Sequence, residues 1–128
     1  MMFYYRFIII SLAVSLAWLC PSDIYGQSCT ELPETFVSTT RASEIVKKTK
    51  FLYIDRITTE RSSWIKSATF YSCDGKTGFF LLVTNKGNEY LFQEMPVNVW
   101  ERFKQAKSYG EFYNQYIKSK YRLKIRQL

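Results

Sequence analysis

A regular series of cations near the C-terminus has the residue types and the spacing to bind a polyanion. In "IKSKYRLKIR" every second residue is basic: Lys118, Lys120, Arg122, Lys124 and Arg126. On one face of a strand such residues lie about 7 Å apart, which resembles the phosphate spacing of an extended single strand. This spacing predicts salt-dependent binding to a polyanion. The alternative is an edge strand made lysine-rich to prevent aggregation with other sheets.

The net charge of the chain is concentrated in the same region. Residues 27–101 contain nine basic and nine acidic side chains, whereas residues 102–128 contain eight basic side chains and one acidic side chain, Glu111. The formal net charge of +7 therefore lies in the last quarter of the chain. This asymmetry indicates an anionic partner, either a polyanion or an acidic protein. Lys104 and Lys107 favour a basic patch that continues onto the preceding helix.

Two aromatic residues form a second candidate binding feature. Tyr90 and Phe92 are two residues apart in an expected strand, so both side chains project from one face. Aromatic rings beside basic residues can stack on unpaired bases. The alternative is that both rings belong to the hydrophobic core beneath the next helix.

The sequence does not indicate a catalytic or metal-binding site. The chain contains no His, so Ser62, Ser63 and Ser67 have no visible base to activate them. We expect these hydroxyls to hydrogen-bond the turn that enters a strand. Asp55 and Glu60 are isolated and form no pair for general acid–base catalysis. We therefore predict a protein that is not an enzyme and that needs no cofactor.

The N-terminus has the pattern of an export signal. Arg6 precedes an apolar run over residues 7–19, which is too short for an ordinary transmembrane helix. We expect cleavage between Gly26 and Gln27, so that residues 1–26 are a signal peptide and no transmembrane anchor remains. An uncleaved anchor is the alternative. The predicted location is periplasmic or extracellular.

Two cysteines remain after the expected cleavage, Cys29 and Cys73. An even pair in an exported protein favours a disulfide, and two unpaired thiols are the alternative. Neither cysteine belongs to a C-x-x-C pair, so a zinc or redox motif has no support.

Hydrophobic periodicity predicts the strands that position these residues. Strands are expected at 51–57, 64–72, 78–84 and 89–95. Asp74-Gly75 and the "NKGN" stretch, with Gly87 in a left-handed conformation, are expected to form the turns between the last three strands. These three strands should pair as an antiparallel meander.

Hydrophobic periodicity also predicts helices that cover the sheet. Pro96 suits the first turn of a helix, whose apolar stripe contains Val99, Trp100, Phe103 and Ala106. A capping box formed by Ser108 and Glu111 begins a second short helix.

The segments on either side of these elements are predicted as a helix and a strand. Residues 41–49 can form a short helix with Ile45 and Val46 inward and Ser43 as its cap. The period changes toward 2 after Ser119, so the tail is expected to be a strand, although a helical continuation is also open. The predicted fold is therefore α+β: an antiparallel meander of three to five strands, two short covering helices and a C-terminal strand.

Three stretches carry a resemblance to a known family: "SSWIKSATF", "GNEYLFQEMP" and "AKSYGEFYNQYIKSKY". They are similar to the KTSC domain, whose pattern is S-S-x-I-x-S, then Y-x-Y, V-P and S-x-G-x-[YF]-[FY]-N-x-x-I-x-x-x-Y. The matching residues are Ser62, Ser63, Ile65, Ser67, Tyr90, Phe92, Met95, Pro96, Ser108, Gly110, Phe112, Tyr113, Asn114, Ile117 and Tyr121. Phe92 replaces the second Tyr of Y-x-Y, and Met95 replaces the usual Val.

The resemblance implies a small binding or interaction module over residues 62–128, preceded by an N-terminal extension over residues 27–61. The family occurs at the C-terminus of some lysyl-tRNA synthetases and alone in bacterial proteins, a context that suggests RNA binding. The export signal weakens nucleic acid as a partner here and leaves an envelope polymer or an acidic protein. The alternative is a structural or protein-assembly domain whose basic face is only solvated, and an enzyme is a remote alternative.

Overall fold

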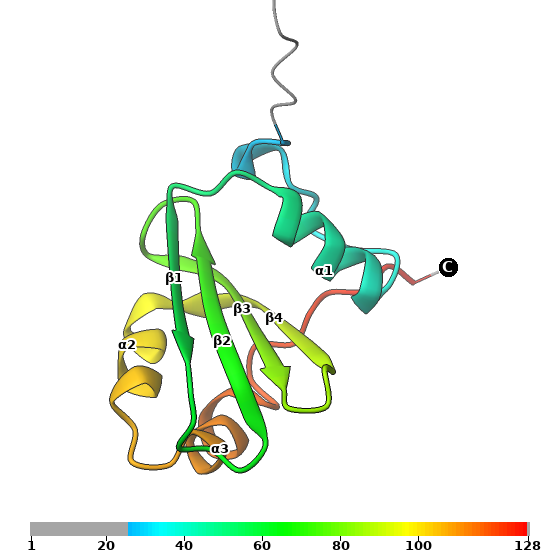
Figure 1. Cartoon of the computed structure of the whole chain (residues 1–128). Helices are drawn as coiled ribbons and strands as arrows, with labels where there is room; N and C mark the ends of the chain where they lie inside the picture. The colour runs from blue at the N-terminus through cyan, green and yellow to red at the C-terminus, as the bar shows by residue number, and fades with distance from the viewer. Residues whose placement is uncertain (1–25, 128) are drawn as a thin grey trace, which may run out of the picture.

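A four-stranded antiparallel sheet forms the centre of the fold. The computed structural model describes residues 26–127, so the expected signal peptide lies outside the described residues apart from its last residue. The strands are β1 (Tyr53–Thr58), β2 (Ile65–Ser72), β3 (Thr77–Thr84) and β4 (Glu89–Pro96), and they pair in the order β1-β2-β3-β4 (Figure 1). The predicted α+β fold and its meander are confirmed.

The turns between the strands have the conformations that the sequence predicts. Gly75 and Gly87 have φ angles of 75° and 87°, in the left-handed region that glycine enters without a steric cost. Asp74 Oδ1 accepts hydrogen bonds from the backbone N–H groups of Lys76 and Thr77, at 2.8 and 3.1 Å. These bonds hold the turn from β2 to β3.

One face of the sheet, called the first face here, is covered by α2 (Val97–Gln105) and α3 (Tyr109–Phe112). One turn of π-helix, Tyr113–Ile117, continues α3. Trp100 stacks on Phe70 with ring centroids 5.8 Å apart, and its indole N–H donates to Asp55 Oδ2 at 2.8 Å. The two predicted covering helices are therefore present, and Trp100 of α2 is fully buried against the sheet.

The opposite face, called the second face here, is covered by α1 (Thr39–Lys48) (Figure 1). Ala42 and Val46 of α1 pack with Leu81 and Leu91 of the sheet in a second hydrophobic cluster. Residues 27–61 thus contribute both a strand and a helix to the layered fold. Within residues 26–127, no helix has the length and apolar character to span a membrane.

The helix predicted at residues 41–49 exists, but the predicted cap is wrong. Helix α1 begins at Thr39, and Ser38 Oγ accepts a hydrogen bond from Arg41 N at 3.2 Å. Ser43 instead lies inside the helix on its buried side. Several hydroxyl residues precede the apolar stripe, and the earliest of them caps the helix.

The C-terminal segment after Lys120 is extended, but it does not form a regular strand. It makes isolated bridges, one antiparallel from Arg122 to Phe92 and one parallel from Ile125 to Phe36. Tyr121 packs against the core of the first face, whereas Leu123 packs against the cluster of the second face. The tail therefore contacts the cores on both sides of the sheet and ends beside α1 (Figure 1).

Candidate anion-binding surface

Gln93 fastens the basic tail to the rest of the fold. Its backbone N–H donates to the Tyr121 carbonyl at 3.0 Å. Its side-chain Oε1 accepts from Lys124 N at 3.0 Å, and its Nε2 donates to the Glu34 carbonyl at 2.9 Å. Because Gln93 is only 7% exposed, these bonds form where water competes weakly. One side chain therefore joins β4, the tail and the N-terminal segment.

Phe36 holds the other side of the tail. Its backbone N–H donates to the Lys124 carbonyl at 2.9 Å, and its carbonyl accepts from Arg126 N at 2.7 Å. The Phe36 ring is 2% exposed and belongs to the cluster on the second face. The backbone of the tail is thus hydrogen-bonded on two sides, which fixes the directions in which its side chains leave it.

A β-bulge in β4 brings a carboxylate to the tail. Between the Gly78–Met95 and Phe80–Phe92 pairs, β4 has one more residue than β3. Glu94 is this extra residue. Its φ angle is 57°, a conformation uncommon for a residue other than glycine. Its Oε1 accepts from Lys124 Nζ at 2.8 Å. The bulge therefore neutralises one cation of the tail.

All five cations of the tail are exposed, but the single strand face expected for them does not form. Lys118 and Lys120 belong to the helical turn that follows the π-helix, whereas Arg122, Lys124 and Arg126 belong to the extended segment. The reason is that the helical conformation continues past Ile117, with Lys120 N donating to the Ile117 carbonyl at 3.1 Å.

Arg102 and Tyr116 extend the basic tail onto the helices, and neither was predicted from the sequence as part of a binding surface. The Arg102 guanidinium lies 4.8 Å from the centre of the Tyr116 ring, and Lys120 Nζ lies 5.5 Å from the same centre. Such distances are typical of cation–π contacts. The available signal was the four-residue spacing of Phe112 and Tyr116, whose rings do meet, at 4.7 Å.

Lys104 does not belong to this basic surface, contrary to the sequence analysis. Its Nζ lies 2.6 Å from Asp55 Oδ2 and 3.2 Å from Glu101 Oε1. The hydrogen bond that Lys104 donates to Asp55 raises the pKa of Lys104, and the hydrogen bonds that Asp55 accepts from Lys104 and Trp100 lower the pKa of Asp55. Lys104 instead joins α2 to the edge strand β1. Lys107 is exposed.

Of the two candidate stacking residues, only Tyr90 has an accessible ring. Phe92 is 7% exposed and packs against Phe80 and Tyr113, with ring centroids 6.0 and 5.6 Å away. Tyr90 is 44% exposed. Phe92 has the core position that was the alternative prediction, because the β4 face on which it lies is the one that α2 and α3 cover.

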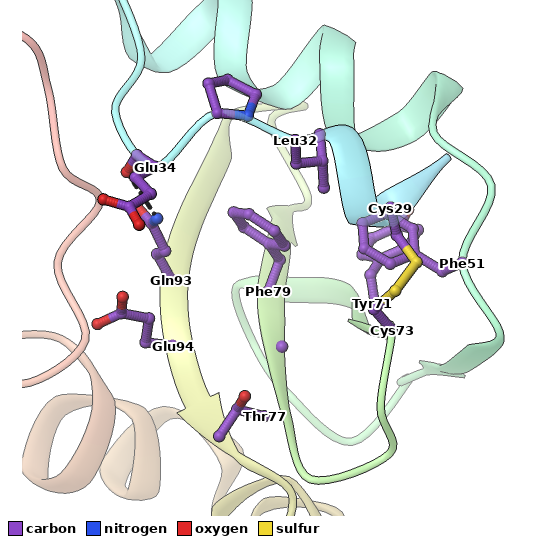
Figure 2. Close-up of a pocket in the computed structure, with 12 residues that line it drawn as sticks. Cys29, Leu32, Glu34, Phe51, Tyr71, Cys73, Thr77, Phe79, Gln93 and Glu94 are labelled. Carbon is purple, nitrogen blue, oxygen red and sulfur yellow. Dashed lines mark hydrogen bonds between the residues drawn. A yellow bond between two sulfur atoms is a disulfide. The ribbon is translucent and has the colours of Figure 1, made fainter. Parts of the chain in front are cut away.

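A hollow of about 190 Å³ on the second face has the opposite electrostatic character. Figure 2 shows Phe79 in its middle, the disulfide and Phe51 on one side, and Glu34 and Glu94 on the other. Glu34 and Glu94 are the charged residues that line the hollow. The hollow is therefore unsuited to an anion.

The predicted disulfide between Cys29 and Cys73 is present at the edge of this hollow (Figure 2). Their Cα atoms lie 5.7 Å apart, within the usual range for a disulfide. Cys29 begins a 3₁₀ turn, Cys29–Glu31, and Cys73 directly follows β2. The bond therefore ties the N-terminal segment to a central strand.

Comparison with known proteins supports the family resemblance. Residues 79–121 match the family model described as the KTSC domain. This segment of the chain is therefore similar to the KTSC domain. Among solved structures, the chain is similar to a KTSC domain protein from Yersinia pestis, with 23% identity, coverage of 55% of this chain and 93% of that chain, and a TM-score of 0.47. No curated protein matches the chain.

Three residues of the KTSC pattern have clear structural roles. Ser108 caps α3, since its Oγ accepts from Glu111 N at 3.3 Å. Gly110 lies against Trp64, and a Cβ at this position would be 2.7 Å from the indole Nε1. Upstream of the matched residues, Ser62 Oγ accepts from Ile65 N at 3.1 Å, as predicted for the turn into β2. These residues shape the fold.

Proposed function

We propose that this protein is an exported, non-catalytic KTSC module that binds a polyanion through its C-terminal basic surface. This surface consists of Arg102, Lys118, Lys120, Arg122, Lys124 and Arg126. Two observations bear on export: the apolar N-terminal run typical of a signal peptide, and a disulfide, which persists in oxidising compartments. An export route favours an envelope or extracellular polyanion over RNA as the ligand.

The fixed backbone of the tail is the observation that carries this proposal. Hydrogen bonds to Gln93 and Phe36 hold the segment in place, so little chain entropy remains to be lost on binding. Among the residues that the structure describes, Lys124 has an ion-pair partner in Glu94, whereas Lys118, Arg122 and Arg126 have none. Exposed cations without partners can release counterions from a polyanion at low cost.

The test is retention on an anionic polymer such as heparin and on a single-stranded oligonucleotide over a range of salt concentrations. Arg122→Gln combined with Arg126→Gln should reduce the slope of log affinity against log salt by about 1.4 for a single strand, since each lost contact contributes about 0.7. The matched control is Lys76→Gln with Lys86→Gln, which removes the same charge from exposed residues in the two hairpin turns. Equal slopes for the two variants would refute the proposal.

A specific observation also favours the second candidate function, protein assembly. Strand β1 is an edge of the sheet, and at its start Leu52, Tyr53 and Ile54 are 78%, 55% and 57% exposed. An exposed apolar edge is a template for pairing with another strand. Ile54→Lys should abolish any self-association seen by sedimentation, and a monomer at all concentrations would leave this candidate without support.

A further inference from the structure

A second group of cations lies on the other side of the sheet from α2 and α3. On the second face, the part of β1 and β2 beside α1 forms a groove of about 250 Å³. The polar groups that line it include Lys47, Arg56, Lys66, Thr69, Tyr71 and Glu89. All of these except Glu89 precede residue 79, so most of the groove comes from residues outside the matched KTSC segment.

The charges in this groove do not balance. Lys47 Nζ contacts both carboxylate oxygens of Glu89, at 2.8 and 3.1 Å, and these two charges cancel. Arg56 and Lys66 have no ion-pair partner within residues 26–127. Two positive charges therefore face a small volume, which favours a dianion over a neutral ligand or a cation.

The floor of the groove presents hydroxyl groups to the same volume. Arg56 and Thr69 are directly paired across β1 and β2, so their side chains leave the same face. Tyr71 lies two residues beyond Thr69 in β2, so its side chain leaves the same face of the sheet. Burial raises the pKa of the Tyr71 phenol, whereas the charges of Arg56 and Lys47 act to lower it. Both cations therefore lie close enough to act on the phenol.

We propose that this groove is a separate binding site for a small phosphomonoester, such as a phosphorylated sugar or polyol. A phosphomonoester carries about −1.5 to −2 charges near neutral pH, which matches the uncompensated Arg56 and Lys66. The planar guanidinium of Arg56 offers paired donors to phosphate oxygens, and the hydroxyls supply further polar contacts. The volume is below the usual range for drug-sized ligands, so it suits a compact molecule.

This site is independent of the polyanion surface. The cations of the groove come from α1, β1 and β2, whereas those of the C-terminal basic surface come from α2 and from the chain after α3. Neutralising Arg56 and Lys66 should therefore change the slope of log affinity for heparin against log salt no more than the control variant, Lys76→Gln with Lys86→Gln, does. A failure at one surface can thus be distinguished from a failure at the other.

The experiment is an amide chemical-shift titration of the purified protein with glycerol phosphate, inorganic phosphate and acetate at constant ionic strength. Saturable shifts are expected in β1 and β2 with both phosphates, and weaker binding is expected with acetate. Arg56→Gln combined with Lys66→Gln should weaken glycerol phosphate binding by at least about tenfold, since charge-assisted hydrogen bonds are lost. The Lys76→Gln and Lys86→Gln control should leave it unchanged.

Arg56→Lys keeps the charge but removes the guanidinium fork, so intermediate affinity is expected. Because Arg56 and Lys66 are both exposed, these variants should keep the thermal unfolding temperature of the parent protein. The proposal is overturned by shifts that do not saturate, by shifts confined to the C-terminal basic surface, by equal affinity of the two double variants, or by acetate binding as tightly as glycerol phosphate.

Discussion

Replacing Gln93 with Ala should release the tail from the sheet. The substitution removes two side-chain hydrogen bonds, one to the Glu34 carbonyl and one from Lys124 N. It also leaves a space in a position that is 7% exposed. The backbone bond from residue 93 to the Tyr121 carbonyl is independent of the side chain and should remain.

The expected loss in the free energy of unfolding is about 2–3 kcal/mol. Each of the two hydrogen bonds contributes about 1 kcal/mol net, and truncation of a buried side chain adds a packing loss. Glu34 and Lys124 are themselves exposed, so water can reach their unpaired backbone groups after the change. This access keeps the cost well below that of a fully buried orphan group.

Urea unfolding measures the global loss, and amide hydrogen exchange shows where it occurs. The Lys124 and Arg126 amides should exchange about tenfold to a hundredfold faster. This range corresponds to a decrease of roughly 1.4 to 2.8 kcal/mol in the free energy of local opening. The matched control is Gln115→Ala at an exposed position, where less than about 0.5 kcal/mol is expected. A loss equal to that of the control, or unchanged exchange in the tail, would show that Gln93 does not hold it.

Three further outcomes are expected. Reduction of the disulfide, whose cysteines are separated by 44 residues, should lower the free energy of unfolding by about 4 kcal/mol in the chain-entropy model; two alkylatable thiols in non-reducing denaturant would contradict the bond. The lowered pKa of Asp55 means that its ionised form stabilises the fold above an aspartate's ordinary pKa, and that this contribution is lost as the pH falls through the lowered value. Asp55→Asn should therefore flatten the decline in the free energy of unfolding between about pH 5 and about pH 2. Urea unfolding at a series of pH values measures this decline. Gly110→Ala places a Cβ 2.7 Å from Trp64 Nε1 and should cost about 1–3 kcal/mol in a thermal unfolding measurement; an unchanged melting temperature would exclude this clash.

The strands and their turns could be predicted because the relevant information is local. Alternation of apolar residues and the Asp74-Gly75 pair depend on neighbours within a few positions, and the structure has the strands and the turn where these signals place them. The helix after Pro96 could be predicted for the same reason, because its apolar stripe recurs at the helical period.

The arrangement of the candidate surface could not be predicted in the same way. No residue type marks Glu94 as the extra residue of a bulge, because its left-handed conformation is imposed by the pairing of β3 with β4. The partners of Gln93 lie 59 and 31 residues away along the chain, so no local pattern reveals them. The tail also has period-2 alternation without being a strand, because its alternate side chains contact cores on opposite faces of the sheet.

The disulfide also determines how the protein responds to mechanical tension. A force that enters at residue 26 reaches Cys29 within a few residues and crosses the covalent bond to Cys73, at the end of β2. The intervening segment, which contains α1, β1 and β2, is bypassed by this covalent path while the bond is intact. About 150 Å of chain is therefore protected from extension, given roughly 3.5 Å per residue. Reduction would make that length extensible, so the thiol–disulfide state sets how far the protein can stretch when it is pulled by its ends.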